Sequence, residues 1–268
     1  MTSTMERPTA VTVGYNGSAF AHRAAHWSAH YARLGVGGVR LVQAYEYNML
    51  DALVSERIVR CARDELAREA GKLRHDFPDL AIDTVLKYGH PGDVLAEATA
   101  DMSVLVVGAG GGGLTHGVFG SEVGRLVRRV PHTVVVVRGA EKRADQSPVV
   151  LGVHDPADDS AAIQFGFDFA ARAGVALNVV HTHPRGVADS TDLAALDQWR
   201  TRYPNVRVTV ESVVGDAART LVERSTHARL LVIGYHGHST LHHTLRRSVS
   251  RAATQHAACP VAITTTPG

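Results

Sequence analysis

Two stretches decide the fold of this chain, because the second repeats the pattern of the first: AIDTVLKYGHPGDVLAEATADMSVLVVGAGG at residues 81–111 and VRVTVESVVGDAARTLVERSTHARLLVIGYHG at residues 206–237. Each stretch opens with a β-branched segment, passes through a turn and an amphipathic segment, and ends in a continuous apolar run followed by glycine. Such an apolar run is typical of a strand that is covered on both faces. We therefore expect strand, helix, buried strand and glycine loop in each stretch.

The repeat extends outward from both stretches. Upstream, AVTVGYNGS at residues 10–18 corresponds to VVLGVHDPADDS at residues 149–160, and an Ala-rich amphipathic segment follows each. Downstream, GSEVGRLVRRVPHTVVVV at residues 120–137 corresponds to RSVSRAATQHAACPVAIT at residues 247–264. Each copy then alternates five strands with four helices. This alternation predicts the α/β class, with a doubly wound, five-stranded parallel sheet in each copy.

The boundary between the copies is marked by composition. The polar, aperiodic segment GAEKRADQS indicates a linker at residues 139–147, between an N-terminal domain at 1–138 and a shorter C-terminal domain at 148–268. The shortening falls on the second helix, which we expect over roughly residues 51–75 in the first copy and 189–203 in the second. The longer helix mixes charged and apolar side chains, as a solvated helix that covers a sheet does.

Matched aspartates offer a local test of the repeat. Asp93 and Asp216 each follow a glycine at corresponding positions, ahead of the third helix of each copy. An aspartate at this place can accept a hydrogen bond from a free N–H group of the first turn. We expect both to be N-caps.

The composition narrows the classes of function. Of 268 residues, 45% are hydrophobic and 20% are charged, and the formal net charge is +2 with acids and bases interspersed. Without a basic block no nucleic-acid partner is expected, and no apolar run reaches the ~20 residues that span a bilayer. The polar first ten residues argue against a signal peptide. Cys61 and Cys259 form no paired motif, fit a reducing cytoplasm, and are expected to be buried.

Two loops have the composition of an anion-binding site. One is Tyr15–Ser18 after the first strand, and the other runs from Gly108 to Gly113, ahead of Ser121. Ligands of an open parallel sheet bind beyond the carboxyl ends of its strands. Glycine lets the backbone approach an anion closely, and the free N–H groups at a helix start favour phosphate. The alternative is a solvent loop with an ordinary serine cap, and we favour the anion site.

The motifs VGYNGS at 13–18, VVGAGGGGLTHGVFGS at 106–121 and RLVRRVPHTVVVV at 125–137 make the chain resemble a tandem universal stress protein. The resemblance covers nearly the whole chain, twice. It implies sheets of the adenine-nucleotide alpha-hydrolase-like kind and, in ATP-binding members, a loop of the form G-x2-G-x9-G-[S/T]. It also implies that the last strands pair, through residues 134–137 and 261–265, into an intramolecular pseudodimer. A further homodimer is left open.

Carried over position by position, the resemblance places the phosphate loop in the first copy. Nine residues separate Gly110 from Gly120, and Ser121 follows, as in the family. Gly108, however, precedes Gly110 by two positions instead of three, and taking Gly111 as the second glycine leaves eight residues before Gly120. The loop is therefore one residue short in either alignment.

The resemblance also implies where the nucleoside would bind. The acidic residue of the family's first loop is Asn16 here, which offers a ribose hydroxyl one acceptor oxygen and no charge. The adenine wall would be Gln43 or Ala44, with Val13 and Val85 as apolar neighbours. We expect weakened nucleotide binding at these residues.

The second copy departs from the pattern at the other end of its loop. Gly234 and Gly237 keep the front spacing, but Arg247 stands where the family has glycine, and Ser248 follows it. Arg247 either fills the phosphate pocket or binds phosphate through its planar guanidinium group. His154 replaces the acidic residue of the first loop. We expect a degenerate site that keeps the fold.

The function implied by the resemblance is that of a cytoplasmic stress-response regulator that binds ATP or another adenine nucleotide, with or without Mg²⁺. The chain has no Walker lysine motif and no evident pair of groups to activate water, so little or no catalysis is expected. One alternative is a scaffold of the same fold that binds no nucleotide and acts through protein partners. The other is a very slow ATPase. The clustered histidines lack accompanying carboxylates or thiols, so no metal site is expected.

Overall fold

The computed structural model describes residues 10–46, 52–99, 104–109, 125–130, 132–138, 146–183, 193–235 and 243–265. Its strands form one ten-stranded sheet to which each copy contributes five neighbouring strands. The strands are β1 (Ala10–Gly14), β2 (Gly38–Tyr45), β3 (Ile82–Tyr88), β4 (Val104–Gly108), β5 (Thr133–Val137), β6 (Val149–Val153), β7 (Leu177–His183), β8 (Val208–Val214), β9 (Leu230–Tyr235) and β10 (Val261–Thr265).

The order across the sheet is β3-β2-β1-β4-β5-β10-β9-β6-β7-β8. All pairs within a copy are parallel, as the alternation of strands and helices predicts. One antiparallel pair, β5 with β10, joins the copies and places Ala262 opposite Val135. The expected pairing of the last strands into a pseudodimer is therefore confirmed. It converts two exposed sheet edges into a continuous ladder.

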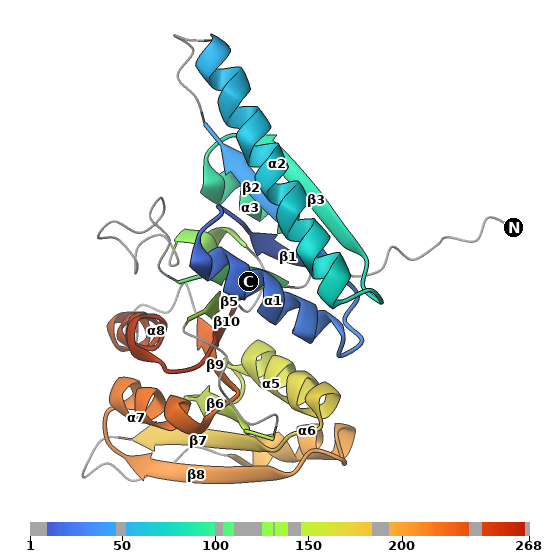
Figure 1. Cartoon of the computed structure of the whole chain (residues 1–268). Helices are drawn as coiled ribbons and strands as arrows, with labels where there is room; N and C mark the ends of the chain where they lie inside the picture. Colours follow the sequence, from blue (N-terminus) through green and yellow to red (C-terminus); the bar gives the residue numbers. More distant parts are fainter. Residues whose placement is uncertain are drawn as a thin grey trace, which may run out of the picture.

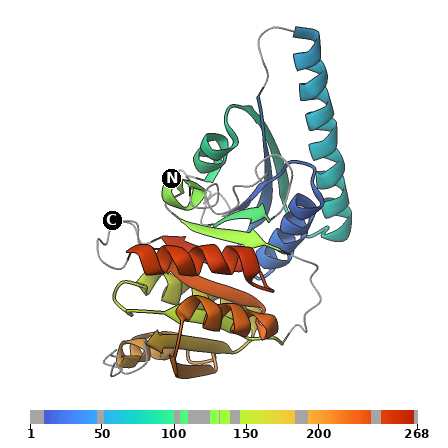
Figure 2. The ribbon, with the colours of Figure 1, turned by 90° about the vertical axis from the view of Figure 1, so that its left-hand side faces the viewer.

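Helices cover both faces of this sheet (Figures 1 and 2). One core cluster lies between the sheet and the helices α1, α2, α5 and α6, and a second lies between the sheet and α3, α7 and α8. The helices are α1 (Ala19–Ala32), α2 (Ala52–Asp76), α3 (Pro91–Thr99), α5 (Ser160–Ala173), α6 (Asp197–Arg202), α7 (Ala217–Arg224) and α8 (His243–His256), with 3-10 turns η1 (Leu193–Leu196) and η2 (Ser225–His227).

The two copies share a core at the contact of α1 with α5. The ring of Phe169 stacks on Trp27 at 6.3 Å and on Tyr31 at 5.4 Å between centroids. Next to these rings, Arg172 donates a hydrogen bond to the carbonyl of Gly35 at 3.1 Å. Because these aromatic side chains are buried against the partner domain, each copy loses part of its core if the other unfolds.

The second helices differ as the sequence predicts. Helix α2 has 25 residues, whereas the corresponding part of the second copy has a four-residue 3-10 turn and the six-residue α6. The amino-terminal end of α2 extends beyond the sheet (Figures 1 and 2). Cys61, on α2, is exposed, so its predicted burial is wrong, while Cys259 is buried as predicted.

The matched aspartates behave differently in the two copies. Asp216 caps α7 as expected, since its side chain accepts a backbone N–H of the first turn at 2.8 Å. Asp93 is not a cap, because α3 already begins at Pro91, whose lack of an N–H is harmless at the first helical position. The N–H of Gly92 is instead bound by Nδ1 of His90 at 3.2 Å.

Candidate functional site

The predicted site of the first copy lies where three neighbouring strands end. Strand β1 sits between β2 and β4, so that Gly14 has Val42 on one side and Val107 on the other. Asn16 follows β1 and Gly108 ends β4 at the same edge of the sheet. The remaining predicted loop residues, which lie outside the described residues, are Gly110, Gly111, Gly120 and Ser121.

The four residues predicted around adenine divide between the two faces of the sheet. Val13 is fully buried in the cluster beneath α1 and α2, and by strand alternation Gln43 belongs to this face. Ala44 and Val85 pack against the other cluster, on the face of α3. The Oε1 atom of Gln43 is buried and makes no hydrogen bond within the described part of the chain. Gln43 is thus the member of this set with an unused polar atom at the strand end.

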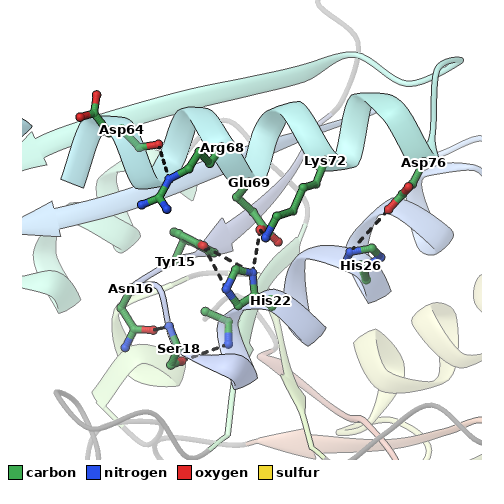
Figure 3. Close-up of polar contacts among 11 residues, drawn as sticks. Tyr15, Asn16, Ser18, His22, His26, Asp64, Arg68, Glu69, Lys72 and Asp76 are labelled. Carbon is green, nitrogen blue, oxygen red and sulfur yellow. Dashed lines mark hydrogen bonds and ion pairs between the residues drawn. The ribbon is translucent and has the colours of Figure 1, made fainter. Parts of the chain in front are cut away.

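The loop from β1 to α1 holds its own polar side chains and leaves two backbone donors unused. Oγ of Ser18 accepts the N–H of Ala21 at 3.2 Å and caps α1, and Oδ1 of Asn16 accepts the N–H of Ser18 at 3.2 Å (Figure 3). Gly17 adopts φ +73°, a conformation that favours glycine. Among the described residues, the N–H groups of Asn16 and Gly17 have no hydrogen-bond partner. Free donors at the start of a 14-residue helix favour an anion.

Gly108 has a packing reason to be glycine. A Cβ at this position would lie 2.3 Å from the carbonyl oxygen of Phe20 and 2.8 Å from the nitrogen of Ala21. The first turn of α1 therefore rests directly on the end of β4.

A polar cluster on α2 was not predicted from the sequence. Glu69 is 1% exposed, with Nδ1 of His22 at 2.6 Å and Nζ of Lys72 at 3.7 Å from its Oε2 (Figure 3). The hydroxyl of Tyr15 lies 3.4 Å from Nδ1 of His22. Burial, and then the negative charges of Glu69 and Glu65, raise the pKa of Tyr15 well above its ordinary value. The signal was present in the helical spacing, because Glu69 falls on the buried stripe of α2.

A second acidic side chain of α2 lies directly on the β1–α1 loop. A Cβ on Gly17 would come within 2.1 Å of Oε1 and 2.7 Å of Oε2 of Glu65. Glu65 is half-buried and makes no hydrogen bond or ion pair with any described residue. The absence of a side chain at position 17 is what lets this carboxylate reach the loop.

The second copy closes the equivalent loop with its own carboxylate. The register of β6 with β7 matches that of β1 with β2, so His154 occupies the place of Asn16. Oδ2 of Asp159 accepts the N–H groups of His154 at 2.7 Å and of Asp155 at 3.1 Å, and Asp159 is 4% exposed. These backbone donors are therefore already bound to an anion that belongs to the chain.

The same register puts His181 in the place of Gln43. His181 is 3% exposed, and its Nδ1 donates to the carbonyl of Val153 at 3.0 Å. The rings of His154, His181 and His183 lie in a row with centroids 6.5 and 6.4 Å apart. In the parts of the chain that the structure describes, no three His, Cys, Asp or Glu side chains gather in a way that would hold a metal ion.

The comparisons with known proteins agree with the repeat. The model of the universal stress protein family matches residues 9–138 and again residues 147–265. The chain belongs to the universal stress protein family. A universal stress protein of Mycobacterium tuberculosis strain H37Rv is 30% identical over 203 residues, which is 69% of each chain. One of Mycolicibacterium smegmatis is 27% identical and covers 94% of this chain and 96% of its own.

Solved structures extend the likeness to the whole fold. A universal stress protein from Archaeoglobus fulgidus superposes with a TM-score of 0.78 over 97% of this chain and 100% of its own, at 14% identity. At this identity the likeness shows the fold of this universal stress protein and nothing finer. Among the described helices of the present chain, none combines the length and apolar character needed to cross a bilayer.

Proposed function

We propose that this universal stress protein binds ATP or a related adenine nucleotide in its N-terminal domain and acts as a cytoplasmic regulator without efficient catalysis. The observation that carries the proposal is the difference between the two first loops. The N–H groups of Asn16 and Gly17 are unused in one copy, whereas Asp159 occupies the corresponding donors in the other. A ligand has two unused backbone donors in the first domain, whereas in the second domain Asp159 already occupies them.

The base is proposed to be adenine because of Gln43. Its buried Oε1 lacks a donor within the described residues. A buried acceptor without a partner costs about 1–3 kcal/mol, and the exocyclic amino group of adenine supplies the missing donor. The phosphates would then extend toward the loop after β4, whose Gly110, Gly111, Gly120 and Ser121 the resemblance assigns to them, with Mg²⁺ as their counterion.

The second domain is proposed to keep the fold without the ligand. Its loop donors are occupied by Asp159, and His181 replaces the amide of Gln43. In the sequence, Arg247 stands where the first copy has Gly120, and the structure places it within α8. We therefore expect one nucleotide for each chain.

Calorimetric titration with ATP tests the proposal. The unmodified protein is expected to bind one ATP, and Gly120→Arg, which introduces the residue of the second copy, is expected to lose binding. Gly71→Arg is the matched control, because a side chain at Gly71 meets nothing within 4 Å on the exposed face of α2. No heat from the unmodified protein would favour the scaffold without nucleotide. A turnover assay with Mg-ATP is expected to stay at background.

A further inference from the structure

Glu65 is an acceptor that nothing in the described protein uses. Its two carboxylate oxygens rest on Gly17, in the loop between β1 and α1. It is half-buried, and it forms no ion pair although Arg68 and Lys72 stand on the same helix. Arg68 instead donates to the backbone carbonyl of Asp64 at 3.3 Å, and Lys72 points to Glu69 (Figure 3).

The position of the Glu65 carboxylate indicates which part of a bound nucleotide can lie beside it. A carboxylate repels phosphate, so the phosphates cannot lie against Glu65. Hydroxyl groups, by contrast, are donors that a carboxylate binds strongly. Glu65 and Gln43 also belong to the same face of the sheet, under α2. The unused acceptors thus mark a nucleoside end on the α2 side of the loop.

We propose that Glu65 is a specificity-determining residue that accepts hydrogen bonds from the ribose hydroxyls of the nucleotide. The proposal rests on the nucleotide binding proposed above and adds a discrimination that the loop itself cannot make. Asn16 uses its Oδ1 on Ser18, and Ser18 uses its Oγ on Ala21, so neither oxygen is left without a donor. Ribose recognition then depends on a helix that is shorter in the described part of the second copy, so only the first copy is expected to show it.

The proposal makes Gly17 a second requirement. Any Cβ at position 17 would collide with the Glu65 carboxylate at 2.1 to 2.7 Å and push it away from the loop. Gly17→Ala and Glu65→Gln therefore remove the same interaction by different routes. Combined in one protein, they should weaken ribose recognition no more than the stronger of the two does alone.

The experiment is a calorimetric comparison of ATP with 2′,3′-dideoxy-ATP, which lacks both ribose hydroxyls. The unmodified protein is expected to bind ATP about 10- to 100-fold more tightly than the dideoxy compound, as for a hydrogen bond to a charged acceptor. Glu65→Gln is expected to abolish this preference and leave the dideoxy affinity almost unchanged. Glu56→Gln, an exposed acid of the same helix paired with Arg60, is the matched control and should keep the preference.

A rescue variant tests the position of the charge. Asn16→Asp returns a carboxylate to the same loop, one residue before Gly17, so Glu65→Gln with Asn16→Asp should recover part of the preference for ATP. If the unmodified protein binds neither compound, the proposed function fails and this inference fails with it. If it binds both equally, or if Glu65→Gln keeps the preference, the nucleotide site stands and the role of Glu65 is refuted. Tighter binding of both compounds by Glu65→Gln would show that the carboxylate opposes the ligand.

Discussion

The two domains of this universal stress protein share their strand order but treat the loop after the first strand in opposite ways. In the N-terminal domain Ser18 caps α1, and the N–H groups of Asn16 and Gly17 are unused among the described residues. In the C-terminal domain Asp159 binds the corresponding N–H groups with its carboxylate. The second copy therefore satisfies internally the backbone donors that stay unused in the first.

The second helices of the two domains, α2 and α6, add to this difference. Helix α2 brings Glu65 to the first loop and Glu69 to His22 of α1, whereas the short α6 has no buried residue of its own. On the proposed function, the comparison teaches that the two copies differ at two separate parts of the binding site. One is the loop after the first strand, and the other is the second helix.

The largest expected effect tests whether the two domains unfold independently of each other. Phe169→Ala removes a 2%-exposed ring that stacks on Trp27 and Tyr31 of the other domain. We expect a loss of about 3–5 kcal/mol in the free energy of unfolding, in a single transition of both domains. Urea titration followed by fluorescence and circular dichroism measures it. Ile58→Ala, at a 40%-exposed position, is the control and should change stability little.

The next effect would test the internal carboxylate of the second loop. Asp159→Ala leaves two backbone donors of the loop without their charged acceptor, so we expect a loss of about 2–3 kcal/mol in the free energy of unfolding. Chemical denaturation measures the loss. A neutral result would mean that Asp159 is replaceable by water and that the second loop is as open as the first.

A smaller effect is expected at the first loop. Ser18→Ala removes the N-cap of α1 and should cost about 1 kcal/mol, because the N–H of Ala21 becomes free. The same denaturation assay measures it. A cost larger than that of Asp159→Ala would reverse the comparison and make the first loop the more rigid of the two.

The smallest effect is a dependence of stability on pH that arises from two tyrosines of the N-terminal domain. It does not appear at neutral pH. Burial raises the pKa of both Tyr15 and Tyr31 above the ordinary value of 10.0. The unfolded chain therefore loses these protons first, and stability should fall as the pH rises above about 10. Urea midpoints between pH 8 and pH 11 measure the slope. Tyr15→Phe with Tyr31→Phe should flatten it, and an unchanged slope would contradict the assignment.

Some features of the site could be predicted and others could not. The loop that holds Asn16 and the cap at Asp216 follow from local spacing, because turns and caps depend on neighbours in the chain. Asp93 is not a cap, against the prediction, because α3 already begins at Pro91. Cys61 was expected to be buried because its neighbours are partly apolar, yet it lies on the solvent side of α2.

By itself, the sequence determined the repeat, the alternation of strands and helices, and the shortening of the second helix, since hydrophobic periodicity and turn residues act over a few positions. Only the tertiary structure decided that Glu65 rests on Gly17, that His22 meets Glu69, and that Asp159 binds the donors of its own loop. The first two contacts join separate helices and loops, and the third depends on the side-chain direction of one aspartate among several. Such contacts are set by the packing of the finished fold, which no local pattern encodes.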